Sequence, residues 1–320
     1  MSAAEFEVLV HATNFEAHGV HSFELRAPDG ADLPAFTAGG HIDVHLPNGL
    51  TRSYSLVNSQ AETHRYVIAV SLDRNSTGGS KYLFEHPLVG QTLKISPPRN
   101  NFALIEDAPS VVLIAGGIGI TPLHSMILRL EELGKSWALH YGVRDRASAA
   151  FCQELAALEA AHPGRVHFNF DLEDGHMLDV ESVVAEAPAD AHLYCCGPGP
   201  MLDIYKAATA GRAPETVHWE YFAAPPVPTS SEQSFTVELS STGETYEVGP
   251  GESILAVLIE NGVHAPSNCR AGMCGECVVE VLEGEPDHND CVLSERERAS
   301  NGLMMICVSG CKSKKLVIDL

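Results

Sequence analysis

The chain has 320 residues, of which 42 are acidic and 20 basic, giving a formal net charge of −22. This negative charge argues against nucleic acids and anionic membranes as partners, because both attract basic surfaces. The charge serves either solubility alone or steering toward a partner with a basic docking patch. A chain of this length is expected to form two or three domains of about 100–150 residues each.

The sequence predicts a cytoplasmic protein. It contains no apolar run of the roughly 18 residues that a membrane-spanning helix needs, and Met1–Phe6 lacks the basic start and apolar core of a signal peptide. Thiols stay reduced in the cytoplasm, so the nine cysteines favour metal binding or chemistry over a disulfide framework.

Residues 1–104 are predicted to form a small antiparallel β-barrel. Short segments of alternating polarity are separated by turn signals such as Pro28-Asp29-Gly30 and Pro47-Asn48-Gly49, a pattern typical of this architecture. The expected strands are Phe6–His11, Val20–Arg26, Ile42–Leu46, Tyr66–Leu72 and Thr92–Ser96.

Residues 105–224 are predicted to form a doubly wound parallel sheet, because apolar strands alternate with helical segments. Val111–Ala115 is a continuous apolar run, as expected for a strand buried on both faces. The other expected strands are Trp137–Gly142, Val166–Phe170 and His192–Cys196, and the expected helices are Leu123–Leu133, Phe151–Ala160 and Val180–Ala187.

A Pro- and Ser-rich stretch after this domain predicts a semi-rigid linker, assigned to residues 225–233. Residues 234–320 are then predicted to form a third domain of their own. Its first part is expected to be a hairpin of Phe235–Leu239 and Thr245–Val248, followed by a helix at Ile254–Asn261.

Four cysteines of the third domain match the ligand spacing of a plant-type [2Fe–2S] cluster. Cys269, Cys274 and Cys277 form a Cys-x4-Cys-x2-Cys loop, and Cys307 follows after a long gap. Small residues in the loop let the backbone come close to the cluster, so that the backbone amides can form hydrogen bonds to the cluster sulfurs. The alternatives are a zinc site, which usually pairs two short cysteine hairpins, and ordinary buried cysteines.

The other cysteines outside the nucleotide motif, Cys152, Cys195, Cys291 and Cys311, lack the cluster spacing. We expect the first two to be packing residues and the last two to be bystanders of the cluster.

Two segments of the first domain could hold a flavin. Arg52-Ser53-Tyr54-Ser55 alternates a cation, an aromatic ring and hydroxyls along one expected strand, so that Arg52 and Tyr54 share a face. The aromatic ring can stack on isoalloxazine, and Ser55 can bond a ring nitrogen. An exposed strand is the alternative. Gly79 and Ser80 begin a helical stretch, whose free amides suit either a phosphate or a simple N-cap.

Two segments of the second domain could hold a dinucleotide. The sequence from Gly116 to Pro122 follows the buried strand and precedes a helix, which is where a parallel sheet presents a ligand site. Gly117, Thr121 and Pro122 lie in it, and a tight structural turn is the alternative. Cys196, Gly197 and Pro198 end a later strand at the same sheet edge.

Together these motifs resemble the phthalate dioxygenase reductase family over essentially the whole chain and in that family's domain order. The resemblance implies a flavin barrel, a nucleotide domain and a C-terminal α+β β-grasp ferredoxin domain, with FMN, NADH and a [2Fe–2S] cluster as cofactors. Arg52, Tyr54 and Ser55 match the family's flavin motif, and Ser71–Arg74 with Gly79-Ser80 its FMN-phosphate segment. Glu220-Tyr221-Phe222 is similar to the segment that closes over the flavin.

The resemblance also implies a role for each site residue. Tyr54 and Ser55 would hold the flavin ring, and Arg52 and Ser80 its phosphate. Gly117 and Thr121 would hold the dinucleotide, Cys196 would lie near the nicotinamide C4, and Phe222 would cover the flavin until nicotinamide displaces it. Ser55, Cys196 and Phe222 are therefore the residues expected at the reacting atoms.

The implied electron acceptor is a Rieske-type non-haem iron oxygenase that hydroxylates or demethylates aromatic acids. One alternative is an NADH-dependent flavin and iron–sulfur reductase that serves another one-electron acceptor. Another is a non-catalytic redox sensor. For nucleotide choice, Asp145 would disfavour a 2′-phosphate, whereas Arg144 and Arg146 could accept one or form salt bridges with neighbouring helices.

Overall fold

The computed structural model describes residues 4–72, 78–222, 233–267, 270, 272 and 275–320. The chain divides into two compact units, residues 1–222 and 223–320, each with its own architecture. None of the helices in the described part of the chain is long and apolar enough to cross a membrane.

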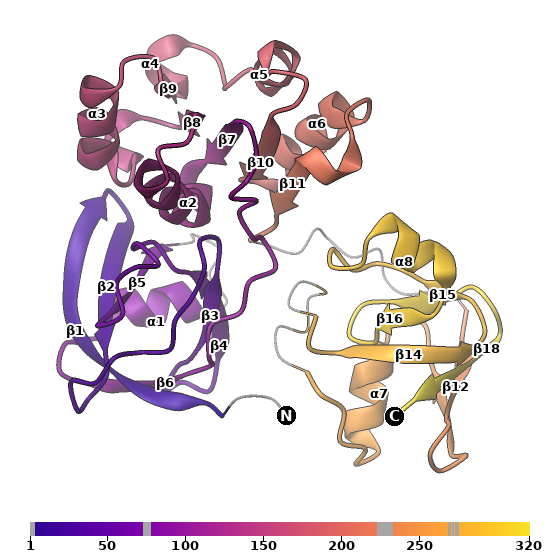
Figure 1. Cartoon of the computed structure of the whole chain (residues 1–320). Helices are drawn as coiled ribbons and strands as arrows, with labels where there is room; N and C mark the ends of the chain where they lie inside the picture. Colours follow the sequence, from indigo (N-terminus) through magenta and orange to yellow (C-terminus); the bar gives the residue numbers. More distant parts are fainter. Residues whose placement is uncertain (1–3, 73–77, 223–232, 268–269, 271, 273–274) are drawn as a thin grey trace. The chain divides into compact units, whose positions relative to one another are not determined.

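Strands β1 to β6 fold as the predicted antiparallel barrel (Figure 1). Its strand order is β4-β3-β6-β1-β2-β5, and a bridge between Leu56 and Ile68 joins the two edge strands. Core side chains such as Val10, Phe23 and Ile42 are fully or almost fully buried inside it. The strands are β1 (Phe6–Ala17), β2 (Val20–Arg26), β3 (His41–His45), β4 (Thr51–Ser55), β5 (Tyr66–Ser71) and β6 (Thr92–Ile95), and one helix, α1 (Gly79–Glu85), follows β5.

The second part of the same unit is a parallel five-stranded sheet in the order β11-β10-β7-β8-β9. The order reverses between β7 and β10, which is where ligands bind in open α/β sheets. The strands are β7 (Val111–Gly116), β8 (Trp137–Val143), β9 (Val166–Phe170), β10 (His192–Cys196) and β11 (Val217–Glu220). The helices are α2 (Ile120–Glu132), α3 (Cys152–Ala161), α4 (Asp171–Asp174), α5 (Val180–Glu186) and α6 (Gly199–Thr209), with 3₁₀ turns η1 (Gly117–Gly119), η2 (Arg146–Ser148) and η3 (Pro214–Thr216).

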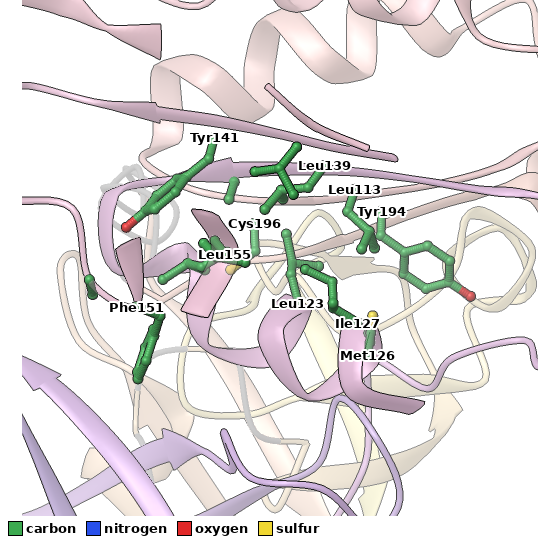
Figure 2. Packing of buried hydrophobic residues seen from close by; sticks show 14 of the residues in the cluster. Leu113, Leu123, Met126, Ile127, Leu139, Tyr141, Phe151, Leu155, Tyr194 and Cys196 are labelled. Carbon is green, nitrogen blue, oxygen red and sulfur yellow. The ribbon is translucent and has the colours of Figure 1, made fainter. Parts of the chain in front are cut away.

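Helix α2 lies between one face of the parallel sheet and the barrel, and packs on both. Leu123 and Ile127 contact the sheet around Leu113 and Leu139 (Figure 2), and barrel residues Val57, Ala69 and Phe102 belong to the same buried cluster. Helices α5 and α6 cover the opposite face around Ile114, Leu193 and Leu202. The barrel and the parallel sheet therefore share one buried cluster at their boundary, which fixes their relative position within this unit.

The C-terminal unit has a mixed sheet in the order β13-β12-β18-β14-β16, with α7 beside it (Figure 1). A parallel β12–β18 pair next to the β12–β13 hairpin, together with the helix, is the predicted β-grasp arrangement. Its elements are β12 (Phe235–Leu239), β13 (Thr245–Val248), α7 (Ile254–Glu260), β14 (Val278–Glu283), β15 (Pro286–Asp287), α8 (Glu295–Ser300), β16 (Leu303–Met305), β17 (Gly310–Cys311) and β18 (Lys315–Asp319).

Candidate functional site

The flavin motif lies on β4, one of the two edge strands of the barrel order. Arg52 and Tyr54 are half-buried and Tyr54 packs on the barrel core, whereas Ser53 is exposed and Ser55 is buried. Burial raises the pKa of Tyr54 to about 12, so its ring stays neutral. Ser55 pairs with His41 of β3 in the strand register.

Arg52 and Gly79 form a cradle between β4 and α1. A Cβ at Gly79 would lie 2.8 Å from Arg52 Cγ and 2.9 Å from Arg52 Nε, so a side chain here would displace Arg52 from its present position. Gly79 and Ser80 are the first two residues of α1, after Gly78 with φ of 109°. A cation beside the amides of a helix start suits the phosphate of FMN. Residues 73–77, which include Asp73 and Arg74 of the predicted phosphate segment, lie outside the described residues.

A buried polar cluster that no local pattern predicts holds β4 against β3. Asp43 is 1% exposed, pairs with Arg99, and accepts a 2.5 Å hydrogen bond from Ser53 Oγ. Burial, followed by the Arg99 charge, lowers the pKa of the neighbouring His41 to about 4, so that its imidazole is neutral. Sequence reasoning missed these residues because they meet only through strand pairing; Arg99 bridges to His41 across the sheet.

The two dinucleotide segments meet at the switch point of the parallel sheet. Gly119 lies so close to the next loop that a Cβ would stand 2.1 Å from the Cys196 carbonyl oxygen. A Cβ at Gly116 would stand 2.7 Å from Pro198 Cδ. These glycines bring the two loops into backbone contact.

Gly117 differs from its neighbours because it faces open space. Its φ is +55°, and nothing lies within 4 Å of a Cβ built there. A dinucleotide can therefore approach the backbone at this point. Thr121 is buried with its hydroxyl donating to the Ile118 carbonyl (3.0 Å), and Pro122 occupies the first turn of α2, as predicted.

Cys196 ends β10 beside Glu220 of β11, its partner in the strand register. The Cys196 side chain points into the buried cluster of Figure 2, and burial, followed by the Glu220 carboxyl, raises the pKa of its thiol well above the ordinary value. Glu220 Oε2 is buried and has no hydrogen-bond partner among the described residues. Burial raises the pKa of Glu220 to about 8, which keeps the carboxyl largely protonated at neutral pH.

Glu220→Gln is expected to stabilise the first unit increasingly as the pH rises. Between the unfolded pKa of 4.5 and the folded value of about 8, the unfolded chain releases a proton that the folded chain retains, so the wild type loses stability with rising pH. Each unit by which the pKa in the folded protein exceeds the pKa in the unfolded chain corresponds to about 1.4 kcal/mol. Thermal unfolding near pH 5 and near pH 8 measures the effect, expected to be several kcal/mol at about pH 8.

The matched control for that experiment is Glu215→Gln, an exposed residue of the same segment. Its stability difference from the wild type should stay small at both pH values. A Glu220→Gln gain that is no larger near pH 8 than near pH 5 would show that the carboxyl is ionised in the folded protein.

Phe222, the last residue of the first unit, is 38% exposed. Its neighbour Tyr221 accepts a 2.7 Å hydrogen bond from Lys206 Nζ, whose charge also lies 4.9 Å from the Trp219 ring centroid. Lys206 of α6 thus holds the Tyr221 side chain, next to Phe222.

Two of the three residues considered for nucleotide choice, Asp145 and Arg146, are engaged within the protein. Asp145 accepts a 2.9 Å hydrogen bond from Ser148 N and caps η2. Arg146 lies 4.2 Å from the Phe170 ring centroid and pairs with Glu173 at 3.3 Å. The salt-bridge alternative therefore holds for Arg146.

Of the four predicted iron–sulfur ligands, Cys277 and Cys307 lie within the described residues. Both are buried, and their Sγ atoms lie 3.1 Å apart, which exceeds a disulfide bond and suits two ligands of one metal ion. Gly272 of the ligand loop packs on Val308 and Asp290 and accepts a hydrogen bond from Cys291 N. The predicted ligands Cys269 and Cys274 lie outside the described residues. Cys311 Sγ donates to the Ser313 carbonyl at 2.7 Å.

Comparison with known proteins identifies two domains. Residues 113–207 match the oxidoreductase NAD-binding domain, and residues 237–312 match the 2Fe–2S iron–sulfur cluster binding domain. The chain is 52% identical to tetrachlorobenzoquinone reductase of Sphingobium chlorophenolicum, covering 95% of this chain and 94% of the relative. It is 49% identical to phenoxybenzoate dioxygenase subunit beta of Ectopseudomonas oleovorans, covering 99% and 98%.

A solved structure of phthalate dioxygenase reductase, described as a modular structure for electron transfer from pyridine nucleotides to [2Fe–2S], matches with a TM-score of 0.73 and 38% identity. It covers 99% of this chain and 98% of that one. The fold and site thus define an NADH-dependent iron–sulfur flavoprotein oxidoreductase that uses FMN and passes electrons to a [2Fe–2S] cluster. The chain belongs to the phthalate dioxygenase reductase family.

Proposed function

We propose that the chain is the reductase component of a Rieske-type non-haem iron oxygenase that hydroxylates or demethylates aromatic acids. Electrons would pass from NADH to FMN, then to the [2Fe–2S] cluster, and from there to the oxygenase. The observation that carries this proposal is the union of an NAD-binding domain and a 2Fe–2S domain in one chain that aligns end to end with a dioxygenase subunit.

The proposed roles follow the geometry of the first unit. Arg52 and Ser80 hold the FMN phosphate beside Gly79, while Tyr54 stacks on the flavin ring and Ser55 bonds it. Gly117 admits the dinucleotide, Thr121 and Pro122 shape the loop that holds it, and Gly197 and Pro198 place Cys196 near the nicotinamide. When bound, FMN supplies the conversion of a two-electron hydride into single electrons.

Phe222 would shield the flavin from water until nicotinamide takes its place. We also propose that Cys269, Cys274, Cys277 and Cys307 ligate the cluster. The domain limits are proposed at residues 1–104, 105–224 and 234–320, with a linker at 225–233.

A second candidate is a reductase that serves another acceptor, such as a quinone. The observation that favours it is the 52% identity to a tetrachlorobenzoquinone reductase. Both candidates share the same flavin, nucleotide and cluster residues, so only the acceptor separates them.

The two candidates predict different acceptor kinetics. With NADH in excess, we expect the purified holoprotein to support turnover of an aromatic-acid Rieske oxygenase at a rate that a generic flavin reductase cannot match. Tetrachlorobenzoquinone is the second acceptor to test in parallel. Fast quinone reduction with no preference over a generic reductase in oxygenase turnover would favour the second candidate.

If electrostatic steering brings the oxygenase to this protein, the rate of their association should depend on salt concentration. The net charge of −22 should draw a partner with a basic docking patch, and the Debye length falls from about 10 Å at 0.1 M to about 3 Å at 1 M ionic strength. The second-order rate constant with the oxygenase should therefore fall as salt rises. A salt-independent constant would remove the steering argument.

A further inference from the structure

His124 is a buried histidine of α2 that links three elements of the first unit. It is 4% exposed, and its ring centroid lies 4.7 Å from that of Phe151, which immediately precedes α3. Its Nδ1 lies 3.1 Å from the carbonyl oxygen of Val57, in the barrel, and its Nε2 lies 2.9 Å from Glu154 Oε2, on α3. None of the sequence motifs includes this residue.

Both partners of the His124 ring are hydrogen-bond acceptors. A backbone carbonyl only accepts, and the hydrogen bond from His124 lowers the pKa of Glu154, with a smaller effect from Arg65, so that this carboxyl is ionised and also only accepts. A neutral imidazole carries one N–H, whereas the imidazolium carries two. A hydrogen bond to the Val57 carbonyl therefore requires an N–H at Nδ1.

The contact with Val57 ties the proposed flavin strand to the proposed nucleotide helix. Val57 lies two residues beyond Ser55, and His124 lies three residues beyond Thr121 on the same helix. The barrel segment is itself fixed, because the Asn58 side chain accepts from Val67 N at 2.9 Å and donates to the Arg65 carbonyl at 3.1 Å. A second bond across the same boundary joins Ser125 Oγ to the Asn58 carbonyl at 3.1 Å.

We propose that His124 is a positioning residue for hydride transfer, whose ring bridges Val57 and Glu154 and thereby fixes the flavin strand against the nucleotide helix. This inference rests on the proposed roles of Ser55 and Thr121. Hydride transfer needs the reacting atoms about 3–3.5 Å apart, and a misplacement of about 1 Å can cost about 100-fold in rate. A bond that sets the spacing of the two elements therefore acts on the rate of hydride transfer without touching either cofactor.

Two substitutions separate the bridge to the barrel from the bridge to α3. Asparagine places its amide nitrogen near the position of imidazole Nδ1, so His124→Asn keeps a donor for Val57 and loses the one for Glu154. Glutamine places its amide nitrogen near Nε2, so His124→Gln keeps the donor for Glu154 and loses the one for Val57. Both variants lose the ring and its packing on Phe151, so each controls for the structural cost of the other.

The test measures flavin reduction by NADH under anaerobic conditions, by stopped flow and without any electron acceptor, so the identity of the physiological acceptor does not affect it. We expect His124→Gln to slow flavin reduction by about 10- to 100-fold at saturating NADH with little change in NADH affinity. His124→Asn should stay closer to the wild-type rate although its thermal midpoint falls comparably. Equal rates for the two variants, or a His124→Gln rate like that of the wild type, would overturn the proposal.

A second measurement does not depend on activity. Nitrogen-15 NMR of histidine-labelled wild-type protein, with the His124 signals identified by their loss in His124→Asn, reports the protonation of each ring nitrogen. We expect Nδ1 of His124 to carry a proton, as a hydrogen bond to the Val57 carbonyl requires. A ring whose Nδ1 is unprotonated would overturn the bridge to the barrel.

Discussion

Replacing Cys307 with serine is expected to abolish the [2Fe–2S] cluster and to stop NADH-dependent reduction of cytochrome c, while NADH still reduces the bound flavin. Cys307 is 7% exposed and its sulfur lies 3.1 Å from that of Cys277, so both thiols face one ligand position inside the domain core. Changes to residues that only support metal ligands cost about 10- to 100-fold in metal affinity or activity, and losing a ligand should cost more.

The measurement combines iron and sulfide analysis with two assays on the same preparation. Flavin reduction is followed anaerobically, and cytochrome c reduction is followed with NADH in excess. The expected variant has flavin, little iron, a near-normal rate of flavin reduction and only background reduction of cytochrome c. If both activities fell together while flavin was retained, the assignment of separate tasks to the two units would be wrong.

Cys311→Ser is the matched control. Cys311 is buried in the same core as Cys307, and its thiol donates to the Ser313 carbonyl at 2.7 Å. A serine hydroxyl can make the same hydrogen bond, so this variant should keep its iron and its cytochrome c activity. Loss of the cluster in Cys311→Ser would indicate that general disruption of the core, rather than ligand loss, explains the Cys307 result.

Hydrophobic patterns and cysteine spacing predicted the architecture of this chain well. The strands Val20–Arg26, Val166–Phe170, His192–Cys196 and Phe235–Leu239 were predicted at their observed bounds. These segments are apolar or alternating and end at turn residues, so local sequence determines them. The predicted barrel, doubly wound sheet and ferredoxin fold are confirmed.

Elements whose sequences carry contrary signals were not predicted. Helix α6 (Gly199–Thr209) begins with Gly199-Pro200, a pair that usually indicates a turn, although proline is tolerated in the first turn of a helix. Strand β14 (Val278–Glu283) exposes Val278 and Leu282, which blurs its alternating pattern. Tertiary packing determines the secondary structure of these segments.

The residues that support the candidate site could not be predicted from the sequence either. Arg99 pairs with Asp43 across 56 positions of the chain, and His124 bonds Val57 across 67. The sequence places Glu220 only at the start of a motif segment, and the burial of its carboxyl oxygen beside Cys196 depends on the parallel pairing of β10 and β11. Motifs identify groups that touch a cofactor, whereas residues that hold those groups in place are brought together only by the fold.

Gly119→Ala is expected to disrupt nucleotide binding and hydride transfer. The backbone φ of Gly119 is −60°, which any residue adopts, so the cost comes from contact alone. An alanine Cβ would stand 2.1 Å from the Cys196 carbonyl oxygen and 2.9 Å from Gly197 N, both backbone atoms that cannot swing away. The two loops must therefore separate, and a displacement of about 1 Å can cost about 100-fold in rate.

Gly134→Ala provides the control, because Gly134 has a left-handed backbone and open space around it, whereas Gly119 has an ordinary backbone and close contacts. Its φ is +63°, and nothing lies within 4 Å of a Cβ built there, so alanine suffers only the left-handed backbone, at about 1–2 kcal/mol. Gly134 follows α2 at the end away from η1 and the nucleotide loops. Titration with NAD⁺ and stopped-flow measurement of flavin reduction should therefore distinguish the two variants. Gly134→Ala is expected to lose stability but to keep its NAD⁺ affinity and its rate of flavin reduction. Gly119→Ala is expected to lose NAD⁺ affinity and to reduce the flavin more slowly. Normal NAD⁺ binding by Gly119→Ala would place the dinucleotide away from the meeting point of these two loops.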